Sequence, residues 1–157
     1  VAVRSAHRTP DAAAKWALAP FDRDGSESSF QIQADLQDMM QDLVGIVRNE
    51  NEMRQALGRI DDFKAQAEKI AVTGNREYNP GWHTAMDLHC LLTVAAAIAR
   101  SAVARKESRG GHFREDYPRR DDAAFRRHSF VVQGREPWLA WPLQRGFRKR
   151  RARRGTS

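Results

Sequence analysis

The residues whose types and spacing suit chemistry gather in one segment, from Glu107 to Asp122, which alternates arginines with carboxylates around two glycines. His112, Glu115 and Asp116, beside its arginines, have the composition of an acid–base cluster. Alternating charges in a glycine- and proline-rich loop also suit a hydrogen-bonded network of ion pairs that locks two domains together. We favour the second interpretation and expect these docking residues: Arg109, His112, Arg114, Asp116, Tyr117, Arg119 and Asp121.

The rest of the sequence offers no pattern for a metal, nucleotide or catalytic site. His83 and His89 are six residues apart, about 240° around a helix, so they cannot bind one metal from a single face. The one cysteine, Cys90, excludes a disulfide framework. The paired glycines Gly110-Gly111 follow a predicted helix, and no G-x-G-x-x-G sequence occurs. We therefore expect no catalytic, cofactor-binding or metal-ligating residue on this chain.

The net charge of +7 resembles that of a nucleic-acid-binding protein until it is located along the chain. Residues 145–157 contain seven lysines and arginines and no acid, so the rest of the chain is neutral. We expect no specific binding of nucleic acid. Residues 129–157 are predicted to be an irregular basic tail, with a short extended piece at Ser129–Val132.

Three apolar stripes at three- and four-residue spacing predict three helices. The first runs over about residues 30–47, after a capping serine. The second includes Met53 to Ile70 and ends at Gly74-Asn75. The third begins at Asn79-Pro80, a capping residue followed by proline, and runs to about Lys106. The fold class is therefore all-α, a three-helix up-down-up bundle.

The third helix is apolar in nearly every direction over Leu88–Ala99. A helix of this kind is buried on all sides. Either it is the central helix of the bundle, or a larger partner domain packs against it. The apolar run is 12 residues long, whereas a membrane span needs about 20, so we expect no transmembrane segment.

The sequence divides into three parts. Residues 1–29 are rich in proline, glycine and polar residues and are predicted to be an irregular linker, with a short helical turn at Ala12–Leu18. Residues 30–128 form the helical domain, and residues 129–157 form the tail.

The stretch from Leu36 to Asp122 resembles the C-terminal helical domain of the succinate dehydrogenase/fumarate reductase flavoprotein family. The phrases that support this are LQDMM from Leu36, VGIVRNE from Val44, REYNPGW from Arg76 and, above all, ESRGGHFREDYPRRDD from Glu107. L-aspartate oxidase and adenylylsulfate reductase belong to the same superfamily. The sequence FREDYP, residues 113–118, favours the succinate/fumarate branch.

The resemblance implies a spectrin-like three-helix bundle that packs against an FAD-binding domain, with the Glu107–Asp122 loop facing that domain. In the family, the whole subunit interconverts succinate and fumarate through FAD and passes electrons to an iron–sulfur subunit. FAD is therefore expected in the partner domain and no cofactor on this chain. The resemblance implies a cytoplasmic location, peripheral on the inner face of a membrane through partner subunits.

Two functions remain open at this point. The chain is either the C-terminal module of such a flavoenzyme, inactive by itself, or a non-catalytic helical interaction protein that kept the fold. Whether it is a fragment, a separately encoded subunit or a degenerate gene product stays open, as do the direction of catalysis, the quinone and the oligomeric state.

Overall fold

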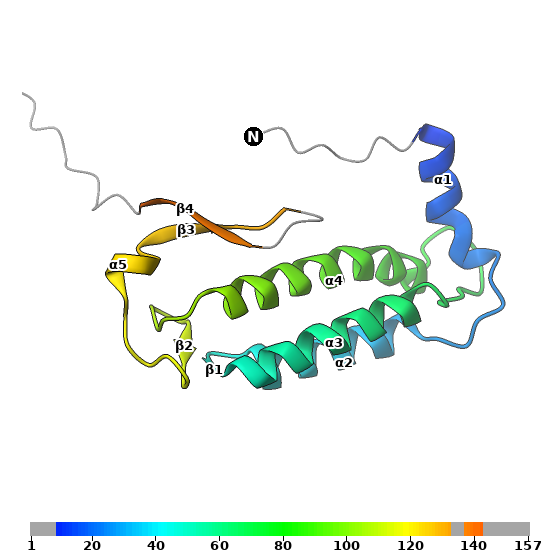
Figure 1. Cartoon of the computed structure of the whole chain (residues 1–157). Coiled ribbons are helices and arrows are strands. Elements are labelled where there is room, and N and C mark those ends of the chain that lie inside the picture. The colour runs from blue at the N-terminus through cyan, green and yellow to red at the C-terminus, as the bar shows by residue number, and fades with distance from the viewer. Residues whose placement is uncertain (1–8, 133–136, 143–157) are drawn as a thin grey trace, which may run out of the picture.

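Three long helices form the body of the protein in the computed structural model, which describes residues 9–132 and 137–142 (Figure 1). The predicted three-helix bundle is confirmed. Its helices are α2 (Ser29–Val44), α3 (Glu50–Ala67) and α4 (Pro80–Ala104). The shorter elements are α1 (Pro10–Leu18), η1 (Ala19–Phe21), β1 (Val47–Arg48), β2 (Phe113–Arg114), α5 (Asp122–Phe125), β3 (Arg127–Phe130) and β4 (Trp138–Pro142).

Each long helix begins after a side chain that accepts the backbone N–H three residues further on. These capping residues are Ser28, Asn49 and Asn79. Proline at the first position of α4 adds a preset backbone angle. α2 ends at Val44, earlier than predicted, because Gly45 is extended and leads into β1.

The core lies where α3 and α4 pack against α2 and against each other. Alanines at the contact, among them Ala56 and Ala99, are fully buried and let the helices approach closely. Only one face of α4 takes part. On its opposite face, Leu91, Val94 and Ile98 are 38%, 56% and 45% exposed, although the sequence predicts a helix buried on all sides.

α4 is also the one helix, within the described ranges, that is long and apolar enough to cross a membrane by length and composition alone. Counting only the 12-residue apolar run underestimated the apolar length of α4, because the mean hydropathy of a longer window stays high despite isolated polar residues. A helix in the core of a bundle passes the same test, and α4 has such a core face, packed against α2 and α3.

The N-terminal segment is more ordered than the predicted linker. α1 is a nine-residue helix, and the Trp82 indole of α4 donates a hydrogen bond to its Ala17 carbonyl at 2.7 Å. The ring of Trp16 lies 5.3 Å from that of His89. The chain then returns along the end of α3, where Glu27 bridges to Ile70.

The segment after residue 128 contains a hairpin, whereas the sequence predicted an irregular tail with a short extended piece at Ser129–Val132, which overlaps β3. β3 and β4 pair antiparallel, with Phe130 opposite Trp138. The hairpin lies along α4 on the side away from α2 and α3 (Figure 1). The arginine-rich stretch 145–157, predicted to be irregular, lies outside the described residues.

Candidate docking loop

The predicted docking loop lies at the end of the bundle where α4 ends and α3 begins (Figure 1). Its anchor is the parallel pair β1–β2, which sets Val47 opposite Phe113 and Arg48 opposite Arg114. The Phe113 N–H donates to the Ile46 carbonyl at 3.1 Å. The loop is therefore fixed to the connection between α2 and α3.

Arg114 is fully buried and terminates α4. Its guanidinium donates to the carbonyls of Ala102, Val103 and Arg105 at 3.1, 3.2 and 3.4 Å. These acceptors at the helix end have no partner within the helix. The same guanidinium holds the Asp116 carboxylate through two hydrogen bonds of 2.6 and 2.5 Å.

The Arg114–Asp116 pair also reaches the first turn of α3. Asp116 accepts the Glu50 N–H at 3.2 Å, and the Glu50 carboxylate lies 3.6 Å from the Arg114 guanidinium. Hydrogen bonds from Arg114 hold the pKa of Asp116 below its usual range. The Tyr117 ring lies 5.0 Å from the guanidinium carbon, a cation–π contact. This pair joins the end of α4 to the start of α3.

A second buried carboxylate, Glu107, organises the other half of the loop. It accepts from Arg105 at 2.6 Å, from Arg109 at 2.7 and 2.9 Å, and from the Asp121 N–H at 2.9 Å. Burial alone raises the pKa of Glu107. The hydrogen bonds from Arg109, Asp121 and Arg105 outweigh that effect, and its pKa lies below the usual value.

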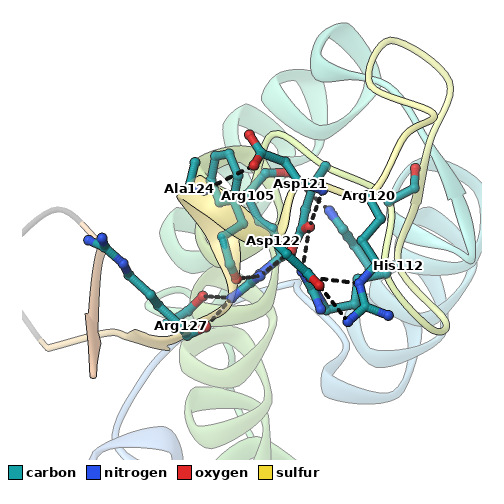
Figure 2. A network of polar contacts seen from close by, with 12 residues as sticks. Arg105, His112, Arg120, Asp121, Asp122, Ala124 and Arg127 are labelled. Carbon is teal, nitrogen blue, oxygen red and sulfur yellow. Dashed lines mark hydrogen bonds and ion pairs between the residues drawn. The ribbon is translucent and has the colours of Figure 1, made fainter. Parts of the chain in front are cut away.

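Asp122 extends this network to the surface (Figure 2). It accepts from Arg109 and Arg120, each at 2.7 Å. Hydrogen bonds from Arg120 and then Arg109 lower the pKa of Asp122 to about 2. Asp121 caps α5 by accepting the N–H groups of the two residues that follow Asp122.

Arg105 attaches the hairpin to the helical body (Figure 2). It donates to the carbonyls of Phe125 and Arg127 at 2.8 and 2.7 Å, and to the Ser129 hydroxyl at 3.1 Å. The same guanidinium forms an ion pair with Glu107. One side chain just beyond the end of α4 therefore connects β3 to the helical body.

His112 lies between two fixed partners. Its Nε2 is 3.1 Å from the Arg105 carbonyl and its Nδ1 is 2.8 Å from an Arg48 guanidinium nitrogen. Because the carbonyl only accepts and the guanidinium only donates, the ring must be the neutral tautomer with the proton on Nε2. Burial, followed by the charges of Arg48, Arg114 and Arg105, lowers the pKa of His112.

This geometry predicts a pH-dependent loss of stability. The folded state favours neutral His112, so its contribution is present above the unfolded pKa of about 6.5 and is lost as pH falls through the lower folded pKa. In urea unfolding at neutral pH and at pH near 5, wild type should lose more stability than His112→Gln, because glutamine can make both hydrogen bonds without titrating. Equal losses would contradict the assigned tautomer.

The three groups of the acid–base hypothesis do not converge on one point. His112 is held by Arg48, Asp116 is paired with Arg114, and Glu115 accepts from the Asn49 amide at 3.5 Å. Within residues 9–132 and 137–142, no three His, Cys, Asp or Glu side chains lie close enough to hold a metal.

The predicted docking residues therefore divide into two sets. Arg109, His112, Arg114, Asp116 and Asp121 are engaged in a network within the chain, and buried Arg114 offers no surface to a partner. Tyr117 and Arg119 are exposed, and their docking role stays a prediction. Arg48, Arg105 and Glu107 also belong to this network, and the sequence did not predict them. Glu107 is the first residue of the ESRGGHFREDYPRRDD segment, but its neighbours in the sequence do not indicate that it is buried.

Comparison with known proteins identifies the family. Residues 33–141 match the family described as "Fumarate reductase flavoprotein C-term", a range that includes β3 and extends past Asp122, where the resemblance seen in the sequence ends. The chain is 35% identical over 110 residues to the fumarate reductase flavoprotein subunit of Haemophilus influenzae, covering 69% of this chain and 18% of that protein.

Solved structures agree. A chain of the Mycobacterium smegmatis Sdh1 complex is 43% identical, with a TM-score of 0.68, over 71% of this chain and 19% of that chain. A chain of E. coli quinol fumarate reductase is 25% identical, with a TM-score of 0.67, over 87% of this chain and 25% of that one. The present chain spans about a fifth of the length of the curated relatives it matches. It belongs to the family of fumarate reductase flavoprotein C-terminal domains.

Proposed function

We propose that this chain positions an FAD-binding domain, as the C-terminal helical module of an enzyme that interconverts succinate and fumarate. The observation that carries the proposal is the exposed apolar stripe of α4, made of Leu91, Val94 and Ile98. These residues recur at helical spacing and form one continuous surface along the helix. An apolar surface of this kind marks an interaction site.

The stripe suits a permanent partner domain. The neighbouring residue Ala97 is small, so a facing surface can approach the helix backbone closely. Full burial of each large apolar side chain contributes roughly 1.5–3 kcal/mol. The stripe faces away from α2 and α3, which already cover the other side of α4.

In this proposal the chemistry belongs to the partner domain. FAD would accept hydride from succinate there, and an iron–sulfur subunit would receive the electrons. This chain would supply a rigid surface, because its loop network fixes the ends of α3 and α4. The assembly would lie on the cytoplasmic side of a membrane, bound to it through other subunits.

Complementation tests this proposal. The flavoprotein chain of the Mycobacterium smegmatis Sdh1 complex can be co-expressed without the part that this chain matches, together with the present chain. We expect a complex that elutes together with flavin absorbance and oxidises succinate. The present chain alone should be colourless and inactive. Failure of the two chains to associate would overturn the proposal.

The alternative, a non-catalytic interaction protein, draws on a different observation. The buried charges of the loop find partners within the chain, so the fold needs no second domain for their satisfaction. A monomer that remains monodisperse alone and ignores the flavin domain is the outcome that this alternative predicts.

A further inference from the structure

A groove runs along α4 on the side of the hairpin. It consists of two adjoining cavities of about 630 and 430 Å³ that share Ala97. Trp16 of α1 and the pair Val131-Val132 border the first cavity, and Ser129 of β3 borders the second. Figure 1 shows the hairpin following the helix above this face. The groove is thus bordered by α4, by α1 and the end of α3 in its first cavity, and by the hairpin segment along both cavities.

Only some of the charged side chains that line the groove have a partner of opposite charge within the described part of the chain. Lys64, Glu68 and Arg105 each have a partner of opposite charge within the chain. Arg48 and Arg100 also line it, and neither forms an ion pair with any residue in the described part. The groove therefore has excess positive charge at two positions, one on β1 and one on α4.

Arg48 is the more informative of the two, because it is partly buried. Its guanidinium donates to the Gly45 carbonyl and to Nδ1 of His112, both neutral acceptors. Burial lowers the pKa of Arg48, since no carboxylate offsets the desolvation of its charge. A partly desolvated cation without a counter-ion is costly for a chain by itself, and a carboxylate placed beside it offsets part of that cost.

We infer that the groove receives an apolar segment of the flavin domain that carries carboxylates opposite Arg48 and Arg100. The apolar part of this segment would contact Val94, Ala97 and Ile98, and its acidic groups would meet the two unpaired arginines. The inference rests on the proposed function and adds the chemistry of the partner surface. Charge complementarity of this kind sets register and association rate.

The first test measures the affinity of the complex formed in the complementation experiment. Arg48→Gln and Arg100→Glu should each weaken it by about tenfold or more. Raising the salt concentration should weaken the wild-type complex more steeply than that of the double variant. Lys69→Gln is the matched control, because Lys69 is exposed and does not line the groove; its affinity should match wild type.

Unchanged affinity in both arginine variants, with the complex still formed, would overturn the inference and leave the proposed function standing. A stable dimer of this chain that occupies the groove and excludes the flavin domain would overturn both.

A second test does not depend on folding of a trimmed flavin domain. Overlapping synthetic peptides that cover the flavin domain of the Mycobacterium smegmatis chain can be titrated into the labelled protein. Shifts in the amide spectra of residues 94–101 report binding. We expect binding from peptides that combine apolar residues with aspartate or glutamate, and loss of binding with the Arg48→Gln/Arg100→Glu protein. Equal binding by peptides without acids, or none by any peptide, would overturn the inference.

Discussion

Arg114→Met is expected to lower the free energy of unfolding by about 2–4 kcal/mol, because it leaves buried acceptors at the end of α4 without their donor. It also breaks an ion pair whose arginine is buried and whose aspartate is partly exposed. Methionine occupies similar space but donates no hydrogen bond. The substitution leaves Asp116 without its cation, and it strips the buried Ala102 carbonyl at the end of α4 of its donor. Urea unfolding followed by circular dichroism measures the loss.

Arg119→Met is the matched control. Arg119 is exposed in the same loop, where its backbone carbonyl accepts the Ser108 N–H. Its replacement should change the unfolding free energy by less than about 0.5 kcal/mol. Similar, small effects of both substitutions would mean that the loop contributes no stability to the bundle and is free to serve a partner.

The sequence alone predicts the opposite for Arg114. From the sequence, Arg109 and Arg114 belong to an exposed loop, and their loss should hardly affect the isolated helices. The structure corrects this, because Arg114 is fully buried. Burial of an arginine depends on which carbonyls the fold brings to it. The pairing of β2 with β1, a strand far earlier in the sequence, holds Arg114 beside the carbonyls of α4.

The helices, in contrast, were predicted well, because the signals that start and end them are local in the sequence. Caps such as Asn79-Pro80 act within three residues, so the sequence contains the whole interaction. The same locality explains the miss at the C-terminal end. β3 is fixed by pairing with β4 and by Arg105, and neither contact leaves a periodic pattern in the four residues of the strand.

For α4, the sequence predicted surplus apolar surface but did not show which face of the helix carries it. An all-round apolar helix predicted either a central helix or a helix with a partner domain. The structure shows that α2 and α3 cover one face and that Val94 remains 56% exposed on the other. The surplus apolar surface, visible in the sequence, belongs to a face that the bundle itself does not use.

Val94→Glu combined with Ile98→Glu is therefore expected to abolish measurable association with the flavin domain, a loss of roughly a hundredfold or more. Docking would bury two carboxylates against the apolar part of the partner segment and would set them against the carboxylates that this segment carries, at several kcal/mol. The fold should be retained, because both side chains are about half exposed in this chain. Co-elution with flavin absorbance, and succinate oxidation by the mixture, are the measurements.

Gln55→Glu is the control for added charge, since Gln55 is exposed on α3, outside the stripe and the groove. It should leave association intact. If the double variant still formed an active complex, the flavin domain would have to contact the module elsewhere, and exposed Tyr117 and Arg119 of the loop would then be the surface to test next.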